Sequence, residues 1–562
     1  MQESRNFSEL LLHHLHQMGV HHAFGVVGGA ISRFYDALTT SEIHPYHCRH
    51  ETGAAFCATE SYFAAKQPAL LFVTTGPGLL NGLTGVAAAK YDGAKLIVIT
   101  GSTNSDIRGR NASQETSSYN YSADFENQNN LFDLSVRIDT PQELAQVLNR
   151  INIGFQKPDG FIAHLSLPLS IQKSLTSLPA SFTLGQYYSC APSAAGLQES
   201  SQRLNQSSFV VAIGHGAKSA AKEVRALIEK TNAHAFATPR GKGILPESHP
   251  NYLGSTGVGG CDEVNVYMKE NQPDVLLVLG SRMGESSTFW DNDLLPAKTI
   301  IQVDLDSTWI GCAQPGFHVI GIQSDIQTYL QALLPHINKV ESTLPEEQWE
   351  KVEVQSPKTD DKVRASYLMG RIQEKIVEST DIILMSEAGN AFAWCNHLLK
   401  FDNPEQYRVS PNYGSMGHFS AGAFGAAITL GRKVLAVVGD GSMLMNCEIN
   451  TAVQYQAPVI WLVLNDAAYD TCEKGLKFLD AKHCELPIPN VNFAHVSQAM
   501  GATGLEIKRE TDIDGILTEA IAVEGPVVID VDIDNNEVSP LFKRFQSIAK
   551  QSRDANVAGW DK

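Results

Sequence analysis

The chain has 562 residues, of which 43% are hydrophobic, enough for several domains that each bury a core of their own. Its formal net charge of −18, without a basic run, argues against nucleic acid and anionic membrane surfaces as partners. Its apolar runs are shorter than the roughly 18 residues of a membrane helix, the first residues do not resemble a signal peptide, and nine cysteines without a Cys-x-x-Cys pair indicate neither a disulfide framework nor a zinc site. We expect a cytoplasmic protein with no membrane partner.

Short apolar strands alternate with helical segments, and two changes in composition divide the chain into three blocks. Residues 175–200 are rich in Ser, Pro, Ala and Thr, and residues 340–362 are polar, charged and contain Pro, so we predict a linker at each place. The alternation predicts an α/β fold of three doubly wound, parallel-sheet domains at residues 1–180, 190–340 and 362–545.

In the first block, glycine-bearing turns accompany the predicted strands and helices. Gly28 lies in the segment from Phe24 to Ala30, and Leu70 to Val73 runs into Thr74-Thr75-Gly76-Pro77-Gly78. Glycine lets a backbone approach a ligand closely, although a plain strand-to-helix turn uses the same residues. Glu51 stands near the start of a predicted helix, where a Glu is most often a capping or salt-bridged residue.

The middle block carries three predicted strands. Phe209 to Ile213, Val275 to Leu279 and Ile300 to Val303 each lead into a turn, the first of which is Gly214-His215-Gly216-Ala217. A single Gly-x-Gly is weak evidence for a nucleotide site, so we do not expect FAD.

Two uninterrupted apolar runs in the third block end in oxygen-bearing residues. Val434 to Val438 ends in Gly439-Asp440-Gly441-Ser442, and Val459 to Leu464 ends in Asn465-Asp466. Such runs are typical of buried parallel strands, whose carboxyl ends bind ligands. A helix predicted over Met445 to Gln456 follows the first turn, whose free amides are suited to phosphate oxygens.

Acidic groups and a phosphate cradle at one edge favour a divalent cation bridged to a diphosphate, because Mg²⁺ shares oxygen ligands between carboxylates, water and phosphates. The two turns also resemble the thiamine diphosphate (ThDP) binding motif, Gly-Asp-Gly followed by Asn-Asn. The resemblance implies a Mg²⁺ site made by Asp440, Asp466 and the backbone carbonyl of Ala468, with Asp466 in place of the family's second Asn. It also implies that Gly441, Ser442 and Asp466 hold the cofactor.

The first block resembles the pyrimidine-binding domain of acetolactate-synthase-like enzymes, on Phe24 to Ala30, on Arg49-His50-Glu51 and on Thr74 to Asn81. The resemblance implies that the Glu51 carboxyl group hydrogen-bonds the aminopyrimidine ring. Such a contact shifts the ring toward the imino tautomer, which removes the thiazolium proton. The cofactor contacts implied in this block are those of Gly28, Glu51, Thr75, Gly76 and Asn81.

Two segments bear on the substrate. Ala112-Ser113-Gln114-Glu115 is similar to the family's Ala-Phe-Gln-Glu segment, which implies that Gln114 faces the reacting carbon. Ser113 replaces an aromatic residue there, and residues 469–477 depart from the pattern of the branched-chain pathway enzymes. Both departures suggest larger or aromatic 2-oxo acids and a role in secondary metabolism.

In the third block, Gly414-Ser415-Met416-Gly417 resembles the family's Gly-Thr-Met-Gly stretch. There the methionine wedges between the two rings of the cofactor, whereas a Met judged alone is a core filler. The resemblance implies cofactor contacts from Gly414, Met416 and Asn390, the last in the loop after the predicted strand Ile382 to Met385. His418 follows the wedge, and the sequence leaves open whether it acts on the substrate as a catalytic residue or packs in the core.

The family resemblance implies decarboxylation of a 2-oxo acid, after which the fragment is released as an aldehyde or joined to a second carbonyl compound. Related simple decarboxylases carry an adjacent His pair in the first domain, but this chain has no histidine between His50 and His164. We therefore predict a carboligase, an acyloin or acetohydroxy-acid synthase. The alternatives are a non-oxidative 2-oxo acid decarboxylase and a catalytically silent regulatory subunit of the same fold.

The two halves of the predicted site lie in different blocks. In relatives these halves come from different subunits, so the resemblance implies a homodimer or homotetramer.

Overall fold

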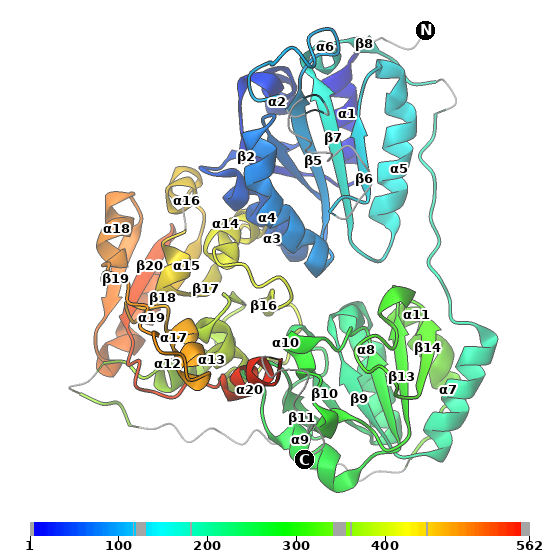
Figure 1. Cartoon of the computed structure of the whole chain (residues 1–562), viewed down its shortest axis with the longest axis vertical. Helices are drawn as coiled ribbons and strands as arrows, with labels where there is room; N and C mark the ends of the chain where they lie inside the picture. Colours follow the sequence, from blue (N-terminus) through cyan, green and yellow to red (C-terminus); the bar gives the residue numbers. More distant parts are fainter. Residues whose placement is uncertain are drawn as a thin grey trace.

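Figure 1 shows the computed structural model of the chain, which describes residues 5–115, 117, 119, 131–179, 182–340, 356–359, 362–445 and 448–551. The described residues form three sheets of six strands, and all strand pairs within these sheets are parallel. α-Helices connect most of the consecutive strands in each sheet. The predicted α/β class with three parallel-sheet domains is confirmed.

The first sheet, blue to cyan in Figure 1, has the order β3-β2-β4-β5-β7-β6. Its strands β4 and β7 are buried along their whole length, as expected for strands covered by helices on both faces. A short antiparallel pair, β1 with β8, ties the start of the chain to the first residues of the predicted linker. The strands are β1 Arg5–Asn6, β2 His22–Val26, β3 His44–His47, β4 Ala69–Val73, β5 Lys95–Ser102, β6 Leu134–Arg137, β7 Phe161–Pro168 and β8 Leu175–Thr176; the helices are α1 Phe7–Gln17, α2 Ser32–Thr39, α3 Glu51–Ala65, α4 Pro77–Asp92, α5 Leu144–Gln156 and α6 Leu169–Gln172.

The second sheet has the order β11-β10-β9-β12-β13-β14. Two of its strands coincide with predicted ones, and the third prediction lies within β13. Helix α7 already begins at Ala194, so the last part of the predicted linker is helical. The strands are β9 Phe209–Ile213, β10 His234–Ala237, β11 Tyr252–Ser255, β12 Val275–Leu279, β13 Thr299–Asp304 and β14 Val319–Gln323; the helices are α7 Ala194–Gln206, α8 Ala221–Thr231, α9 Glu263–Asn271, α10 Glu285–Thr288 and α11 Ile326–Leu333.

The third sheet has the order β16-β15-β17-β18-β20-β19. Both runs that end in acidic residues are strands, and they pair directly, with Gly439 opposite Leu464. The strands are β15 Ile383–Ser386, β16 Tyr407–Val409, β17 Val434–Gly439, β18 Val459–Asn465, β19 Thr503–Ile507 and β20 Val527–Asp532; the helices are α12 Ala365–Ile372, α13 Asn390–Leu398, α14 His418–Leu430, α15 Asp440–Met443, α16 Ile449–Tyr455, α17 Asp470–Phe478, α18 Phe493–Ala499, α19 Ile513–Ala522 and α20 Phe542–Gln551.

The helix predicted over Met445 to Gln456 is shorter in the structure. A brief helix, α15, follows β17 at once, and α16 begins only at Ile449. The residue before α16, Glu448, is fully buried and accepts hydrogen bonds from the amides of Arg49 and His50 at 3.2 and 3.3 Å. This contact with the first domain fixes where the helix begins.

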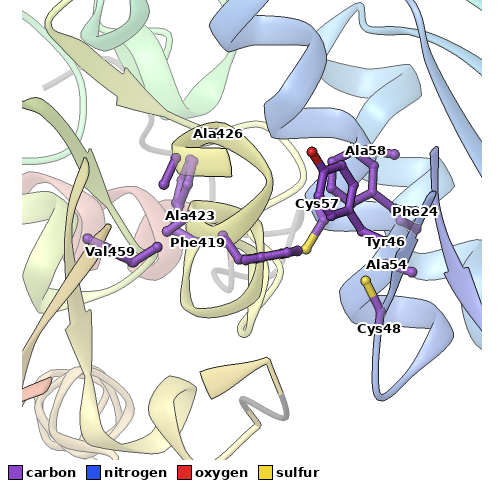
Figure 2. Packing of buried hydrophobic residues seen from close by; sticks show 14 of the residues in the cluster. Phe24, Tyr46, Cys48, Ala54, Cys57, Ala58, Phe419, Ala423, Ala426 and Val459 are labelled. Atoms are coloured by element: carbon purple, nitrogen blue, oxygen red, sulfur yellow. The ribbon is translucent and has the colours of Figure 1, made fainter. Parts of the chain in front are cut away.

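The first and third domains share one hydrophobic core, in which α3 packs against α14. Figure 2 shows Cys57 of α3 and Phe419 and Ala423 of α14 in this interface. A Cβ atom on Gly425 would stand 2.1 Å from the carbonyl oxygen of Cys57, so glycine allows the two helix backbones to touch. The shared core thus joins the two domains that carry the predicted half-sites.

Among the described residues, none of the helices combines the length and the apolar character needed to cross a bilayer.

Candidate functional site

The predicted pyrimidine-side residues gather where α3 begins, beside the amino end of α4. The Asn81 amide donates a hydrogen bond of 3.1 Å to Oε2 of Glu51, and Gly78 leaves room beside Oε1 of the same carboxylate. The N-cap of α3 is His50, whose Nδ1 accepts the amide hydrogen of Thr52 at 3.2 Å. The Glu51 carboxylate is therefore not used for capping, and Asn81 orients it.

Glycines in the adjacent turns serve close approach between loops. A Cβ atom on Gly76, whose φ is +62°, would stand 2.4 Å from the carbonyl oxygen of Gln114, and one on Gly28 would stand 2.6 Å from the Thr74 hydroxyl. The Thr75 hydroxyl donates to the same Gln114 carbonyl at 3.4 Å. The structure thus brings Gly28, Thr75, Gly76 and Gln114 together, with the Gln114 side chain exposed.

The diphosphate side lies at the carboxyl ends of β17 and β18, where two carboxyl groups stand near each other. Oδ1 of Asp440 accepts the amide hydrogen of Gly441 at 2.7 Å, while its buried Oδ2 has no partner among the described residues. Burial, followed by the nearby charges of Asp440 and Asp470, raises the pKa of Asp466 to about 7. Burial also raises the pKa of Asp440.

These features fit a divalent cation. Like charges in a buried site raise a carboxyl pKa, and a cation between the two groups removes that penalty. Ala467 adopts a left-handed backbone conformation with φ +58°, uncommon for alanine, in the turn that leads to Ala468. Asp440 and Asp466 would hold Mg²⁺ here, and Ala468 stands in the turn where a backbone carbonyl ligand is predicted.

Met416 lies against the phosphate-side turn. A Cβ atom on Gly441 would stand 3.3 Å from Cε of Met416 and 2.6 Å from the Tyr469 ring. Gly414 and Gly417, on either side of Met416, have φ values of +63° and +87°, which shape the loop that carries it. The sequence did not predict Tyr469 as a site residue, although it follows Asp466 by only three residues.

Asn390 and Ser442 lie close to this edge, and both already make hydrogen bonds, Asn390 through its side chain and Ser442 through its backbone carbonyl. The Asn390 amide donates to Asp470 at 2.7 Å, and its Oδ1 accepts the hydroxyls of Thr471 and Ser539 at 3.1 and 3.0 Å. The carbonyl of Ser442 accepts the Ser420 hydroxyl at 3.2 Å. The predicted contact between the Asn390 side chain and a diphosphate would have to displace these partners.

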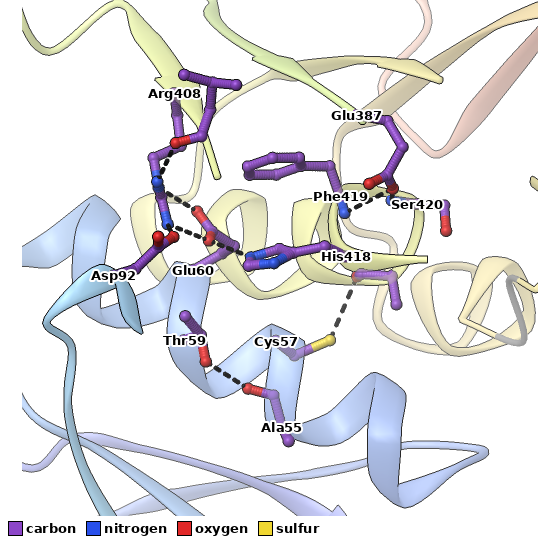
Figure 3. A network of polar contacts seen from close by, with 12 residues as sticks. Ala55, Cys57, Thr59, Glu60, Asp92, Glu387, Arg408, His418, Phe419 and Ser420 are labelled. Carbon is purple, nitrogen blue, oxygen red and sulfur yellow. Dashed lines mark hydrogen bonds and ion pairs between the residues drawn. The ribbon is translucent and has the colours of Figure 1, made fainter. Parts of the chain in front are cut away.

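His418 lies in the interface of α3 and α14 rather than at an open surface (Figure 3). Its Nε2 is 2.7 Å from Oε1 of Glu60, and its ring stacks on Phe56 with the ring centres 4.7 Å apart. These contacts support the packing role that the sequence left open. The substrate-facing role remains a prediction without a supporting contact.

Figure 3 also shows a buried carboxylate, Glu387, that the sequence did not single out. It accepts the backbone amides of Phe419 and Ser420 at 2.9 and 3.1 Å, and burial raises its pKa. The carboxylate therefore anchors the first turn of α14, directly after Met416. Its position in the loop after β15 was the available signal, because that loop was already expected at the site.

Arg408 joins the domains through a second buried network. Its guanidinium donates to Glu60 at 2.8 and 3.0 Å and to Asp92 at 2.6 Å. Although burial favours the neutral acid, Arg240 and Arg408 lower the pKa of Asp92 to about 2. Glu60, Asp92 and His418 are spaced like metal ligands, but Arg408 already supplies the positive charge between the carboxylates.

In the central domain, packing accounts for the glycines of the Gly-x-Gly turn. A Cβ atom on Gly214 would stand 2.3 Å from the carbonyl oxygen of Gly280, and one on Gly216 would stand 2.8 Å from the Cα of Gly280. Two loops at the sheet edge thus touch through their backbones. The expectation that FAD is not bound stays a prediction.

Family models of thiamine pyrophosphate enzymes match all three parts of the chain. The N-terminal TPP binding domain matches residues 5–122, the central domain residues 198–333, and the C-terminal TPP binding domain residues 387–531. Together these matches cover well over half of the chain.

Similar proteins agree with that assignment. The large subunit of acetolactate synthase isozyme 1 from Escherichia coli K12 is 28% identical, over 94% of this chain and 94% of its own length. The putative thiamine pyrophosphate-containing protein YdaP from Bacillus subtilis is 26% identical, over 94% of this chain and 91% of its own. The crystal structure of benzoylformate decarboxylase from Polynucleobacter necessarius superposes with a TM-score of 0.82 at 19% identity, covering 96% of this chain and all of that one, which speaks for the fold alone.

Proposed function

Since the chain belongs to the thiamine pyrophosphate enzymes, in their acetolactate-synthase-like branch, and is a ThDP-dependent carboligase or decarboxylase, we propose the first of these two activities. In this proposal the enzyme decarboxylates a 2-oxo acid and joins the remaining fragment to a second carbonyl compound. Bound ThDP supplies a carbon nucleophile that adds to the 2-oxo acid and accepts the electron pair released with CO₂.

The observation that carries the proposal is the arrangement of Glu51. Its carboxylate is oriented by Asn81 at the edge where the pyrimidine-side residues gather, and helix capping falls to His50 instead. A carboxyl group in that place would hold a proton on the aminopyrimidine ring. Asp440 and Asp466 would hold Mg²⁺ and through it the diphosphate, while Met416 would fix the angle between the two rings.

Carbon–carbon bond formation is proposed over simple release because Gln114 and Glu115, described residues of the segment predicted to face the substrate, supply no free proton donor. Gln114 is a neutral amide, and the neighbouring Glu115 is buried and accepts hydrogen bonds from the Gly109 amide and the Ser117 hydroxyl. Without a positioned acid to protonate the bound fragment, its capture by a second carbonyl compound competes better. Ser113, small and exposed, leaves space for a larger or aromatic 2-oxo acid.

Product analysis tests this proposal. The holoenzyme would be given pyruvate, a branched 2-oxo acid and an aromatic 2-oxo acid, singly and in pairs, with mass spectrometry of the products and Glu51→Gln as the inactive control. We expect hydroxy ketones or acetohydroxy acids, with mixed products from the pairs. Aldehydes alone would favour the decarboxylase, and no turnover with cofactor bound would favour the silent subunit.

We also propose that the enzyme works as a homodimer or homotetramer with its sites between subunits. Exposed apolar side chains border both halves of the site: Leu80 beside Asn81, and Leu444 and Met445 just after Ser442, are 49%, 50% and 56% exposed. Apolar groups clustered at functional edges mark interaction surfaces, and a second copy would cover them.

Mixing two inactive variants tests that arrangement. Glu51→Gln damages the first-domain half and Asp440→Ala the third-domain half, so subunit exchange between them would create one intact site in each mixed dimer. Activity should recover to about a quarter of the wild-type value after equal mixing and exchange. Sites built within single chains would give no recovery, and sedimentation of a fully active monomer would refute the proposal.

A further inference from the structure

A cavity of about 280 Å³ lies where the three domains meet, apart from the cofactor site. Its walls come from the end of α3, from the turns after β9 and β10 in the central domain, and from β15 and β16 of the third domain. We call it the junction cavity, and its lining includes Lys66, His215, Lys218, Arg240, Glu405 and Arg408.

Cationic side chains outnumber acids in the junction cavity. Five cations line it, against the carboxylates of Glu60 and Glu405, and Asp92 lies behind them. Lys218 and Arg240 lie deep, with side chains 19% and 10% exposed, whereas Lys66 is open to solvent. The fifth cation, Arg432, pairs with the exposed Asp381, a contact that solvent screens. Cations thus lie both deep in the cavity, at Lys218 and Arg240, and at its solvent-exposed side, at Lys66.

Several donors in the cavity lack a full set of acceptors. Lys66 and Lys218 each carry three N–H donors, yet both pair with the single carboxylate of Glu405, Lys218 at 3.1 Å. Nε of Arg240 is buried without an acceptor among the described residues. Leaving a buried donor such as Nε of Arg240 without an acceptor costs free energy, so a ligand with several oxygen acceptors would be stabilised here.

The neighbouring titratable groups respond to this positive potential. Burial, then the charges of Arg240, Lys218 and Arg408, lower the pKa of His215 well below its usual value. Burial lowers the pKa of Lys218 to about 8, although Glu405 acts in the opposite direction. At His215 the neighbouring cations thus act in the same direction as burial.

We propose that the junction cavity binds a small molecule carrying a phosphate group. A phosphate group would offset the positive charge, and its three outward oxygens would accept from Lys66, from Lys218 and from the buried Nε of Arg240. The volume is close to the lower end of ligand pockets, roughly 300 Å³, and suits a phosphate ester of a few carbons. Because Lys66 lies in the first domain and Lys218 and Arg240 lie in the central domain, the ligand would also bridge these two domains. The proposal does not depend on which carbonyl compounds the enzyme joins.

Isothermal titration of the ThDP- and Mg²⁺-loaded holoenzyme tests the site, since its own diphosphate site is then filled. Inorganic phosphate and glycerol phosphate are the two phosphate probes, and malonate is a carboxylate dianion for comparison. We expect both phosphates to bind more tightly than malonate, and phosphate to raise the thermal midpoint of the wild type.

Charge-removing variants locate the binding. Lys218→Gln should weaken phosphate binding at least about tenfold, and the solvent-exposed Lys66→Gln, which leaves the buried contacts intact, several-fold. Lys222→Gln, on the exposed face of α8 one turn further along the chain, should change it less than twofold. The proposal would be overturned if the wild type did not bind phosphate or if it bound malonate more tightly than phosphate. It would also be overturned if Lys218→Gln and Lys66→Gln bound phosphate as tightly as the wild type.

Discussion

A cation that binds the Asp440–Asp466 pair should release a number of protons that can be measured. In the cation-free protein the pKa of Asp466 is about 7, so at pH 6 this group is largely protonated and at pH 8 largely charged. A divalent cation binds the carboxylate, so binding must release the proton. From a pKa of about 7, Asp466 contributes roughly 0.9 proton at pH 6, 0.5 at pH 7 and 0.1 at pH 8.

The same shift sets how the stability of the cation-free protein depends on pH. The pKa rises from 3.8 to about 7 on folding, and each unit corresponds to roughly 1.4 kcal/mol. A raised pKa gives a stabilising contribution that is fully present below the unfolded value and is lost as the pH rises through the folded value. The cation-free protein should therefore lose up to roughly 4 kcal/mol between pH 4 and pH 8 at this site.

Asp466→Asn isolates these effects, because the amide keeps an oxygen ligand but does not titrate. Titration calorimetry of Mg²⁺ with ThDP, in two buffers of different ionisation enthalpy, counts the protons released by each protein. At pH 6 the wild type should release about 0.9 proton more than the variant. At pH 8 the two proteins should release almost equal numbers of protons. Equal counts at pH 6 would show that Asp466 does not stand beside the cation.

Further variants test the surrounding contacts. Arg408→Met should destabilise the protein by about 3 to 5 kcal/mol in urea unfolding, because Glu60 and Asp92 would remain buried with only His418 and Arg240 as their partners. Arg408→Lys should cost less, and a loss below about 1 kcal/mol in Arg408→Met would contradict the network's role. Gly441→Ala should weaken ThDP binding at least about tenfold in a fluorescence titration with an unchanged circular dichroism spectrum, since the methyl group would meet the Tyr469 ring at 2.6 Å. Gly439→Ala, where a Cβ atom meets nothing within 4 Å, is the matched control, and equal affinity of the two variants would refute the reasoning.

Much of the phosphate side could be predicted because it depends on local order. Two buried runs adjacent in the sequence form neighbouring parallel strands, so Asp440 and Asp466 had to reach one edge. The same logic predicted the strands of the central domain, which coincide with or fall within the observed ones.

The remaining features depend on contacts between domains, which carry no local pattern. The start of α16 was missed because Glu448 turns toward the amides of Arg49 and His50, some 400 residues earlier. His418 lies only two residues after Met416, yet it points to Glu60 in a helix of another domain. Asn390 was expected to meet a diphosphate, but residues from α17 and from the segment before α20 occupy its side chain.

Glu51 must activate the bound cofactor if the enzyme works as proposed. Hydrogen–deuterium exchange at the thiazolium C2 atom, followed by NMR after rapid quenching, measures that step without any substrate. In Glu51→Gln the cofactor and Mg²⁺ should still bind, while exchange should slow by at least about a hundredfold, the scale of losing a positioned acid–base group. Glu9→Gln, on the exposed side of α1, should exchange like the wild type. Wild-type exchange in a cofactor-loaded Glu51→Gln would contradict the account, because the residue would then belong to the fold and not to the chemistry.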